Sequence, residues 1–362
     1  MKKSLVALAA LAATTAFAQS SVSITGNVDA GYQSIDYKGN KVNGIAGNGS
    51  STTGFRLTGT EDLGGGMRAS FIIGTDFSIV SRNANTGTAS VIATPVNSTA
   101  GTFGNGELSL GLSGGFGALT MGHLAFNTLT SFSNGQPFGT AIGGGYGSAT
   151  RVNAAGNLVR DDNAVRYMTP AMNGFTGSLY KSYKQTKATG TDFSTTFGAY
   201  DKLGSDEIGI NYANGPIAAS YSSLKQDSVS VGTGTTENTV NTLGANYTMG
   251  AAKFFLLNQT NKTTTGTVAT DTKFSSVSAT YTMGATTLMI HSGSLKQSAG
   301  ANAGKKSDLT GIGADYALSK RTTAYLRNES IDDKAGIIAA ASTIDGTGTK
   351  RTRTAIGIRH TF

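Results

Sequence analysis

The chain has 362 residues, no cysteine, and 29 basic against 21 acidic side chains, which gives a formal net charge of +8. The lack of cysteine excludes disulfides and thiolate metal sites. After residue 18, no run of about 18 apolar residues occurs, which excludes a helical membrane protein. The basic residues are scattered, so the sequence lacks the charged patch of a nucleic-acid-binding protein. Fifty glycines against four prolines indicate many tight turns.

The beginning of the chain has the three-part pattern of an export signal. Two lysines are followed by an apolar run over 5–13 and by a small-x-small cleavage site, AFA, that ends at Ala18. The apolar run is too short to cross a bilayer as a helix, which takes about 20 residues. We therefore expect a signal peptide over 1–18 and one mature domain over 19–362, because no linker or change of composition divides the remainder. Export of this kind is typical of a bacterial envelope protein.

Apolar and polar residues alternate along most of the mature chain. In the segment 54–74, Phe55 and Leu57 share one face, a run of glycines follows, and Phe71 and Ile73 resume the alternation. Two alternating runs joined by a tight glycine turn predict a β-hairpin. Similar units recur up to the C-terminus and predict about sixteen strands.

Two kinds of connection alternate between these strands. Short turns carry Gly, Asn or Pro, and several of them follow a tyrosine, which indicates an aromatic girdle. The other connections are longer and rich in Gly, Ser, Thr and Asn. Short turns on one side and long loops on the other are typical of an outer-membrane barrel. The long loops are predicted at 37–50, 78–104, 185–204, 227–238, 262–270, 297–306 and 332–348.

The last strand, 350–362, indicates which face of the sheet is wet. One face carries Ile356 and Ile358 and ends in Phe362, whereas the other carries three arginines. Alternate side chains of a strand point to opposite faces. In a transmembrane barrel the apolar face meets lipid and the polar face meets an aqueous lumen. The three arginines are Arg351, Arg353 and Arg359.

These patterns predict an all-β fold: a 16-stranded antiparallel transmembrane β-barrel with short periplasmic turns and long extracellular loops. Phe362 is expected to anchor the chain at the membrane interface and to act as an assembly signal. A soluble two-sheet sandwich is the alternative, but it would not place aromatic residues at the strand ends. A barrel this wide leaves a water-filled interior.

One loop, at about 125–157, interrupts the rhythm of strands and turns. Its apolar residues, among them Phe132, Pro137 and Phe138, indicate that it folds against a wall of the barrel. Loops of this length are usually functional, and this one would narrow the pore if it folded inward. Its only charged residue is Arg151, so it offers no carboxylate to a passing cation.

Positive charge on the hydrophilic face of the early strands predicts an anion path. Arginine is always charged and acts strongly in a narrow, low-dielectric throat. Glu107 lies on the same face and offsets part of this field. The four arginines on this face are Arg56, Arg68, Arg160 and Arg166.

The histidines do not indicate an enzyme. His291 and His360 share parity with residues assigned to the lipid side, and neither has an evident acidic partner. His123 is expected to line the pore, provided that the chain turns inward after it. We therefore expect no catalytic residue, no cofactor and no metal site.

Five stretches, in order along the mature chain, have a common likeness. They are 22–32 (VSITGNVDAGY), 59–67 (GTEDLGGGM), 110–122 (LGLSGGFGALTMG), 163–170 (NAVRYMTP) and 357–362 (GIRHTF). Together they resemble the trimeric general porins of β-proteobacteria, of the neisserial and Burkholderiales type. The resemblance implies a 16-stranded barrel, three barrels per assembly, and a third loop folded into each pore. It also implies passive diffusion of small hydrophilic solutes, often with a preference for anions.

The resemblance also bears on single positions of the eyelet. Arg160 falls where this family commonly has a basic residue, and Arg56 lies one same-face step from another such position. Two positions depart from the pattern: His123 stands where Arg is common, and Glu107 where some relatives are basic. With no acids in the third loop either, the resemblance implies a weak preference for anions.

The sequence therefore predicts a passive outer-membrane channel for small hydrophilic solutes and inorganic ions. A channel specific for one anionic small molecule and a barrel that serves adhesion or structure are the alternatives. The expected partners are two further copies in a homotrimer, outer-membrane lipids and lipopolysaccharide, and the barrel-assembly machinery, which would bind the C-terminal strand. The expected location is the outer membrane of a Gram-negative cell.

Overall fold

The computed structural model describes residues 20–37, 40–80, 103–146, 159–183, 202–230, 234–333 and 350–362. The predicted signal peptide and Arg151 lie outside these residues. Within them, no helix is both long enough and apolar enough to cross a membrane.

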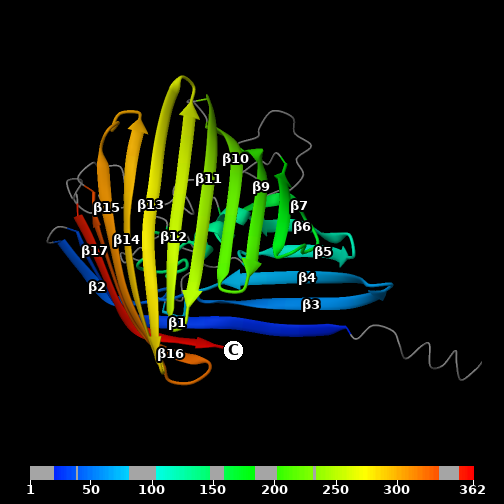
Figure 1. Ribbon diagram of the computed structural model, residues 1–362, viewed down its shortest axis with the longest axis horizontal. Coiled ribbons are helices and arrows are strands. Elements are labelled where there is room, and N and C mark those ends of the chain that lie inside the picture. Colours follow the sequence, from blue (N-terminus) through cyan, green and yellow to red (C-terminus); the bar gives the residue numbers. More distant parts are fainter. Residues whose placement is uncertain are drawn as a thin grey trace, which may run out of the picture.

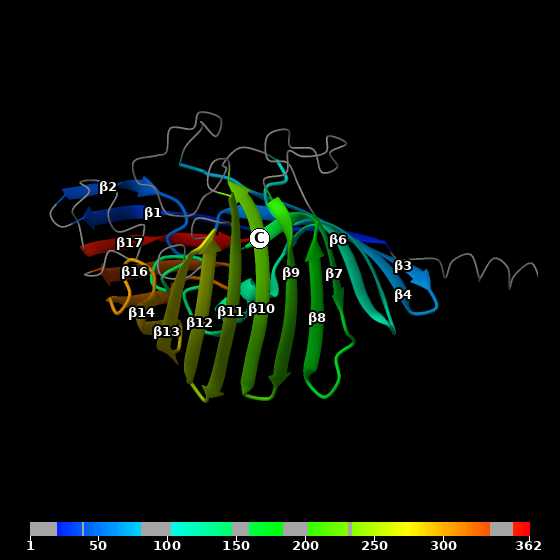
Figure 2. The same ribbon diagram turned by 90° about the horizontal axis from the view of Figure 1, so that it is seen from above.

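The strands form one antiparallel sheet that closes on itself, because β17 pairs with β1 (Figures 1 and 2). Neighbours in the chain are neighbours in the sheet, as expected for hairpins joined in series. The strands are β1 (Ser21–Tyr37), β2 (Asn40–Ala46), β3 (Gly54–Gly64), β4 (Met67–Asp76), β5 (Leu108–Gly114), β6 (Gly117–Ala125), β7 (Arg160–Met168), β8 (Phe175–Ser182), β9 (Lys202–Asn214), β10 (Ile217–Ser230), β11 (Gly234–Met249), β12 (Ala252–Thr265), β13 (Val268–Met283), β14 (Thr286–Ala299), β15 (Lys306–Ala317), β16 (Thr322–Asp332) and β17 (Lys350–Thr361).

These 17 segments make 16 strands of the barrel, since β2 and β3 lie end to end along β1. The C-terminal part of β1, from Gly31 to Tyr37, pairs with β2, and its N-terminal part, from Ser21 to Asn27, pairs with β3. Residues 47–53 between β2 and β3 leave the ladder; we call them the inward segment. The predicted 16-stranded antiparallel barrel is thus confirmed.

The outer face of the barrel is apolar and the inner face carries the charges. Val22, Ile290 and Ile356 are more than half exposed on the outside, while Glu207 and Arg353 are buried on the inside. A soluble sheet has the opposite arrangement, so this one is built to meet lipid.

The C-terminal residue closes the barrel against β1. The Phe362 N–H donates to the Gly26 carbonyl at 3.1 Å, and the Gly26 N–H donates to the Phe362 carbonyl at 3.0 Å. The Phe362 ring lies directly over Gly26, where an added Cβ would be 2.6 Å from the ring. Glycine at this position therefore leaves room for the terminal ring against β1.

Several predicted loops are in fact strand. The range 37–50 contains β2, and the ranges 227–238 and 262–270 are mostly taken up by the ends of β10 to β13. Thr, Ser and Asn dominate these ranges, which made them look like loops. Their polar side chains are tolerated in a ladder because a neighbouring strand supplies partners for the backbone hydrogen-bonding groups.

Candidate functional site

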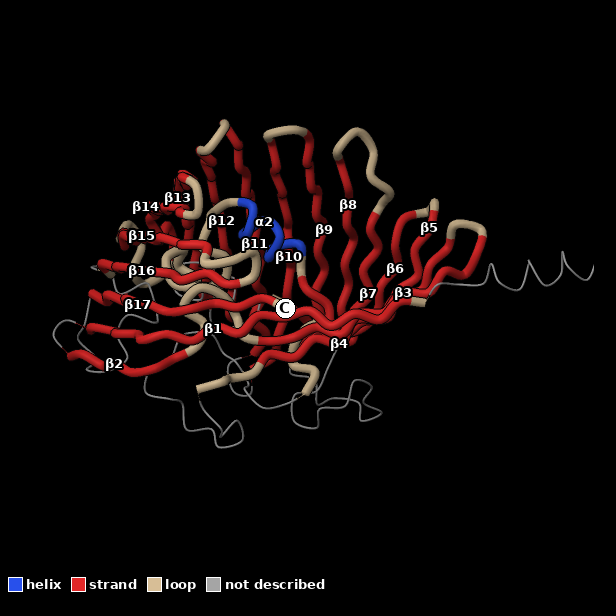
Figure 3. The backbone as a smooth tube through the Cα atoms, turned by 90° about the horizontal axis from the view of Figure 1, so that it is seen from below, coloured by secondary structure: helices blue, strands red, loops and turns tan. Residues whose placement is uncertain are grey.

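The constriction loop, of which residues 126–146 are described, enters the barrel through a short helix, α2 (Asn127–Asn134). The helix lies on the inner side of β10 and β11 (Figure 3). Its own N-cap residue makes no side-chain capping bond. Glu207 of β9 replaces that cap: its carboxylate accepts the N–H groups of Asn127 at 2.5 Å and Thr128 at 2.7 Å. Free N–H groups and the positive end of the helix dipole both favour a carboxylate there.

Glycines on the wall let α2 approach the strands closely. A Cβ added at Gly244 of β11 would lie 1.7 Å from the Ser131 carbonyl oxygen. One added at Gly209 of β9 would lie 2.5 Å from the Asn127 side chain. The backbone of the loop therefore rests directly on the backbone of the wall.

Beyond the helix the loop crosses the lumen to β14–β17, where Glu329 of β16 holds it. The Glu329 carboxylate accepts the N–H groups of Gly143 at 3.0 Å and Gly145 at 3.1 Å. The same carboxylate pairs with Arg351 at 2.9 Å and Arg353 at 2.6 Å, both from β17. A single buried carboxylate thus pairs with two arginines and fixes the loop backbone.

The predicted apolar anchors of the loop have different surroundings. Phe132 is fully buried and packs in a cluster with Tyr146 and Leu257. Burial raises the pKa of the Tyr146 phenol to about 12, so the group stays neutral. Pro137 and Phe138 line a pocket against the opposite wall.

The inward segment is the second part of the constriction. Asp29 of β1 accepts the N–H groups of Gly49 at 3.1 Å and of Ser50 at 2.9 Å, and so folds the segment into the barrel. The Ile142 N–H donates to the Gly49 carbonyl at 3.4 Å, which joins the segment to the constriction loop. The inward segment and the constriction loop therefore meet inside the barrel.

Three of the four predicted arginines gather on one wall, around two acids. Arg56 and Arg166 flank Glu107 at 3.4 Å and 3.5 Å. Arg56 and Arg160 both act electrostatically on the Asp76 carboxylate at the end of β4. The Arg56 side chain is 46% exposed but that of Glu107 only 10%, so the arginine is the group that faces water.

The structure does not bring Arg68 to this cluster. In the β3–β4 ladder, Arg68 lies opposite Asp62 beside the short turn, whereas Arg56 lies opposite Gly74. Gly74 is six residues further along β4 (74 minus 68), which corresponds to about 20 Å along a strand.

His123 is also separate from the cluster. It has the parity of Met121, which is exposed on the outer face, and its Nδ1 lies 2.6 Å from a carboxylate oxygen of Asp162. The extra residue that shifts the register between β6 and β7 falls on β7, where Asn163 has a positive φ of 52°. His123 thus keeps its strand parity up to the entry of the loop.

The prediction that His291 lies on the lipid side is wrong. His291 is buried, its Nδ1 lies 2.8 Å from the Ser278 hydroxyl, and its ring stacks on Phe274. Leu288 and Ile290 are the exposed large apolar residues of this strand. The sequence TTLMIHS holds apolar residues of both parities, so alternation alone could not assign the faces.

Sequence reasoning missed the acids that hold the constriction, namely Asp29, Glu207 and Glu329. It also left the arginines of β16 and β17 out of the candidate site. A usable signal was present for Glu329, because Tyr325, Arg327 and Glu329 alternate with apolar or neutral neighbours. No sequence signal tells which acid faces the loop, since that depends on where the loop crosses the lumen. Among the described residues, no group of three or more His, Asp or Glu side chains could hold a metal ion.

A closed barrel with an apolar exterior, a charged interior and an inward-folded loop defines a transmembrane channel of the outer-membrane type. The chain belongs to the Gram-negative porin family, whose model matches residues 4–336. It is therefore a channel of the Gram-negative outer membrane and not an enzyme.

Individual relatives agree with this assignment. The chain is 36% identical to outer membrane porin protein 32 of Delftia acidovorans over 276 residues, which is 72% of this chain and 70% of that protein. A solved anion-selective porin from Comamonas acidovorans matches with a TM-score of 0.78 at 26% identity, covering 95% of this chain and all of that one. OmpT of Vibrio cholerae, solved in a trimer form, shares the fold with a TM-score of 0.70 at 14% identity over 95% of this chain and 99% of that one.

Proposed function

We propose that this porin is a water-filled general diffusion channel for small hydrophilic solutes and inorganic ions, with a weak preference for anions. The observation that carries the proposal is a difference in exposure on the wall that holds Arg56 and Glu107. The Arg56 side chain is 46% exposed, whereas that of Glu107 is 10% exposed and ion-paired. The acids that hold the constriction, Asp29, Glu207 and Glu329, are buried and already hydrogen-bonded.

Simple electrostatics indicates why the preference is weak. We call the part of the barrel that carries Arg56, Arg160 and Arg166 the first wall. These three arginines lie near two acids, Glu107 and Asp76, which leaves a net charge of +1 (3 minus 2). One unit charge at 6 Å in a water-like dielectric changes the energy of a monovalent ion by about 0.7 kcal/mol. That is about a threefold difference in local concentration, which biases the current without excluding cations.

The test is the reversal potential of single channels in a salt gradient. Combined Arg56→Gln and Arg166→Gln substitutions should shift the reversal potential toward cation preference. Glu107→Gln, on the same wall, should shift it the opposite way and serves as the matched control. Equal reversal potentials in all three proteins would refute the role of this wall.

A channel specific for one anionic small molecule is the second candidate. The pocket beside Arg359, described below, is the observation that favours it. Conductance that saturates with a single class of solute would support this alternative over general diffusion.

We further propose a homotrimer, since porins of this family typically assemble as trimers. Removal of residues 1–18 on export, contacts with lipopolysaccharide, and recognition of the strand ending in Phe362 by the barrel-assembly machinery belong to the same proposal. Crosslinking of the purified protein in mild detergent, followed by mass measurement, tests the assembly. A monomer at all concentrations would contradict the homotrimer.

A further inference from the structure

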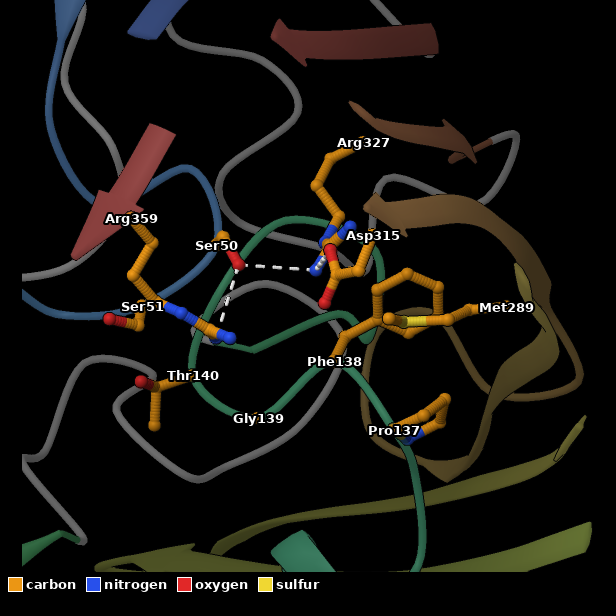
Figure 4. Close-up of a pocket in the computed structure, with 10 residues that line it drawn as sticks. All are labelled: Ser50, Ser51, Pro137, Phe138, Gly139, Thr140, Met289, Asp315, Arg327 and Arg359. Atoms are coloured by element: carbon orange, nitrogen blue, oxygen red, sulfur yellow. Dashed lines mark hydrogen bonds and ion pairs between the residues drawn. The ribbon is translucent and has the colours of Figure 1, made fainter. Parts of the chain in front are cut away.

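A pocket of about 260 Å³ lies on the inner face of the barrel, where the constriction loop meets β14–β17 and the inward segment (Figure 4). One end is polar and the other apolar. The polar end holds Arg359, Ser50, Ser51 and Thr140; the apolar end holds Pro137, Phe138 and Met289; Asp315 and Arg327 lie between them.

Arg359 is the available cation of this pocket. Its contact is a long hydrogen bond of 3.4 Å to the Ser50 hydroxyl. Among the described residues, no carboxylate forms an ion pair with it. Asp29 is its cross-strand neighbour, but that carboxylate accepts backbone N–H groups of the inward segment and the Tyr325 hydroxyl at 2.7 Å.

Arg327 contributes shape rather than net charge. It is buried and paired with Asp315 at 2.7 Å, so the two charges cancel. Its guanidinium also donates to the Ser50 hydroxyl at 3.1 Å and to the Ala314 carbonyl at 3.2 Å. These bonds hold it in place between the two ends of the pocket.

The hydroxyls next to Arg359 are loosely engaged. The Ser51 hydroxyl donates to the Thr52 carbonyl at 3.4 Å, and the Thr140 and Thr52 hydroxyls are 3.3 Å apart. Bonds of this length are weak. A carboxylate that enters could therefore accept from Arg359 and from these hydroxyls, and charge-assisted hydrogen bonds are the stronger kind.

The apolar end is rigid. The Phe138 ring stands edge-on to His291 at 6.2 Å, and the Arg327 guanidinium lies 5.9 Å from its centre. Met289 is almost fully buried beside it. A thioether and an aromatic face are suited to packing against a small ring.

From this arrangement we infer that the pocket binds small monocarboxylates that carry one aromatic ring or a short branched chain. The carboxylate lies on Arg359 and the apolar part against Phe138 and Met289. Sites for drug-sized ligands usually span about 300–1,000 Å³, so the occupant of this smaller pocket is a compact one. The inference rests on the proposed diffusion function, because solute must first enter the lumen.

The test compares three probes on single channels in chloride at constant ionic strength: benzoate, acetate and benzamide. Benzoate should reduce the chloride current saturably. Acetate lacks the ring and benzamide lacks the charge, so each should need at least about tenfold higher concentration for the same effect. If either matched benzoate, the two-ended site would be overturned.

Substitutions of pocket residues test whether benzoate blocks the current by binding in this pocket. Arg359→Gln should raise the half-blocking concentration of benzoate by about tenfold, as loss of a charged hydrogen-bond donor predicts. Arg359→Lys retains the positive charge and should keep most of the block by benzoate. It provides the test if the glutamine variant fails to fold. Met289→Ala keeps every charge and should weaken the block by benzoate but not by acetate. Unchanged block in the folded variants would overturn the inference.

Two further measurements separate this inference from the proposed function. Arg56→Gln on the first wall should change the reversal potential while the half-blocking concentration of benzoate stays within about twofold. The methyl resonance of Met289 should shift on addition of benzoate to the detergent-solubilised porin. A channel that prefers anions but shows neither block nor shift would remove the pocket site and leave the diffusion function standing.

Discussion

Two walls of the barrel carry arginines in opposite settings. On β3 and β7, Arg56 and Arg166 are partly exposed and share the less exposed Glu107. On β17, Arg351 and Arg353 are 1% and 3% exposed and share the fully buried Glu329. Arginine thus faces the lumen on one wall and stabilises the structure on the other.

The difference lies in what the shared carboxylate also binds. Glu329 accepts two N–H groups of the constriction loop in addition to the arginines, whereas Glu107 receives no loop contact among the described residues. A buried ion pair is costly to break, because removal of one partner leaves an uncompensated charge. We therefore expect substitutions on the β17 wall to affect the architecture of the pore and those on the β3 wall to affect its selectivity.

The largest expected effect is that of Glu329→Gln. It removes the carboxylate that the buried Arg351 and Arg353 share, which should cost about 3–5 kcal/mol of stability. It also weakens the hold on the loop, so single-channel conductance should increase and become noisier. Glu107→Gln is the matched control and should change the reversal potential with little change in conductance. Comparable loss of stability in both variants would break the comparison between the two walls.

The next effect is that of Gly244→Ala on the wall behind α2. The new methyl group would lie 1.7 Å from the Ser131 carbonyl oxygen, and overpacking of this kind costs about 1–3 kcal/mol. The helix should move into the lumen and lower the conductance. Gly115→Ala is the control, since nothing lies within 4 Å of its added Cβ. Equal conductance in the two variants would show that α2 is not pressed against β11.

A smaller effect is expected of Glu207→Gln, which keeps the shape of the side chain and removes its charge. Loss of a helix N-cap costs about 0.5–2 kcal/mol. Hydrogen exchange at Asn127 and Thr128 should accelerate, while exchange in β9 itself should not. Unchanged exchange at those two amides would mean that the carboxylate does not cap α2.

The smallest effect is that of Arg68→Gln. Because Arg68 lies beside the turn, about 20 Å along the strand from the level of Arg56, its removal should leave the reversal potential nearly unchanged. Arg56→Gln in the same preparation provides the comparison. A shift as large as that of Arg56→Gln would place Arg68 in the selectivity-determining part of the pore.

The membrane architecture could be predicted from the sequence because it depends on local alternation. The apolar parity of Ile356, Ile358 and Phe362 against the arginines of the same strand indicates the wet face without any knowledge of neighbouring strands. The glycine turn within 54–74 was placed correctly, since Gly64, Gly65 and Gly66 all have positive φ values, which favour glycine.

Strand length and facing were less predictable. The polar ends of β10 to β13 were assigned to loops, and His291 was assigned to lipid. The first error arose because a neighbouring strand satisfies the backbone hydrogen bonds, and local composition does not reveal whether that neighbour is present. The second arose because apolar residues of both parities precede His291, so alternation does not assign its face.

Side-chain parity and turn chemistry are local properties, so the chain alone predicts an inverted barrel, about sixteen strands and arginines on the wet face. Which of the charges meet water depends on how distant segments pack together. Glu329 and Glu207 accept backbone N–H groups of the constriction loop, and Asp29 accepts those of the inward segment. Arg359 remains available to a solute because these segments engage the acids around it. Contacts between residues nearly two hundred positions apart, such as Glu329 with Gly143, follow from closure of the barrel and leave no local pattern in the chain.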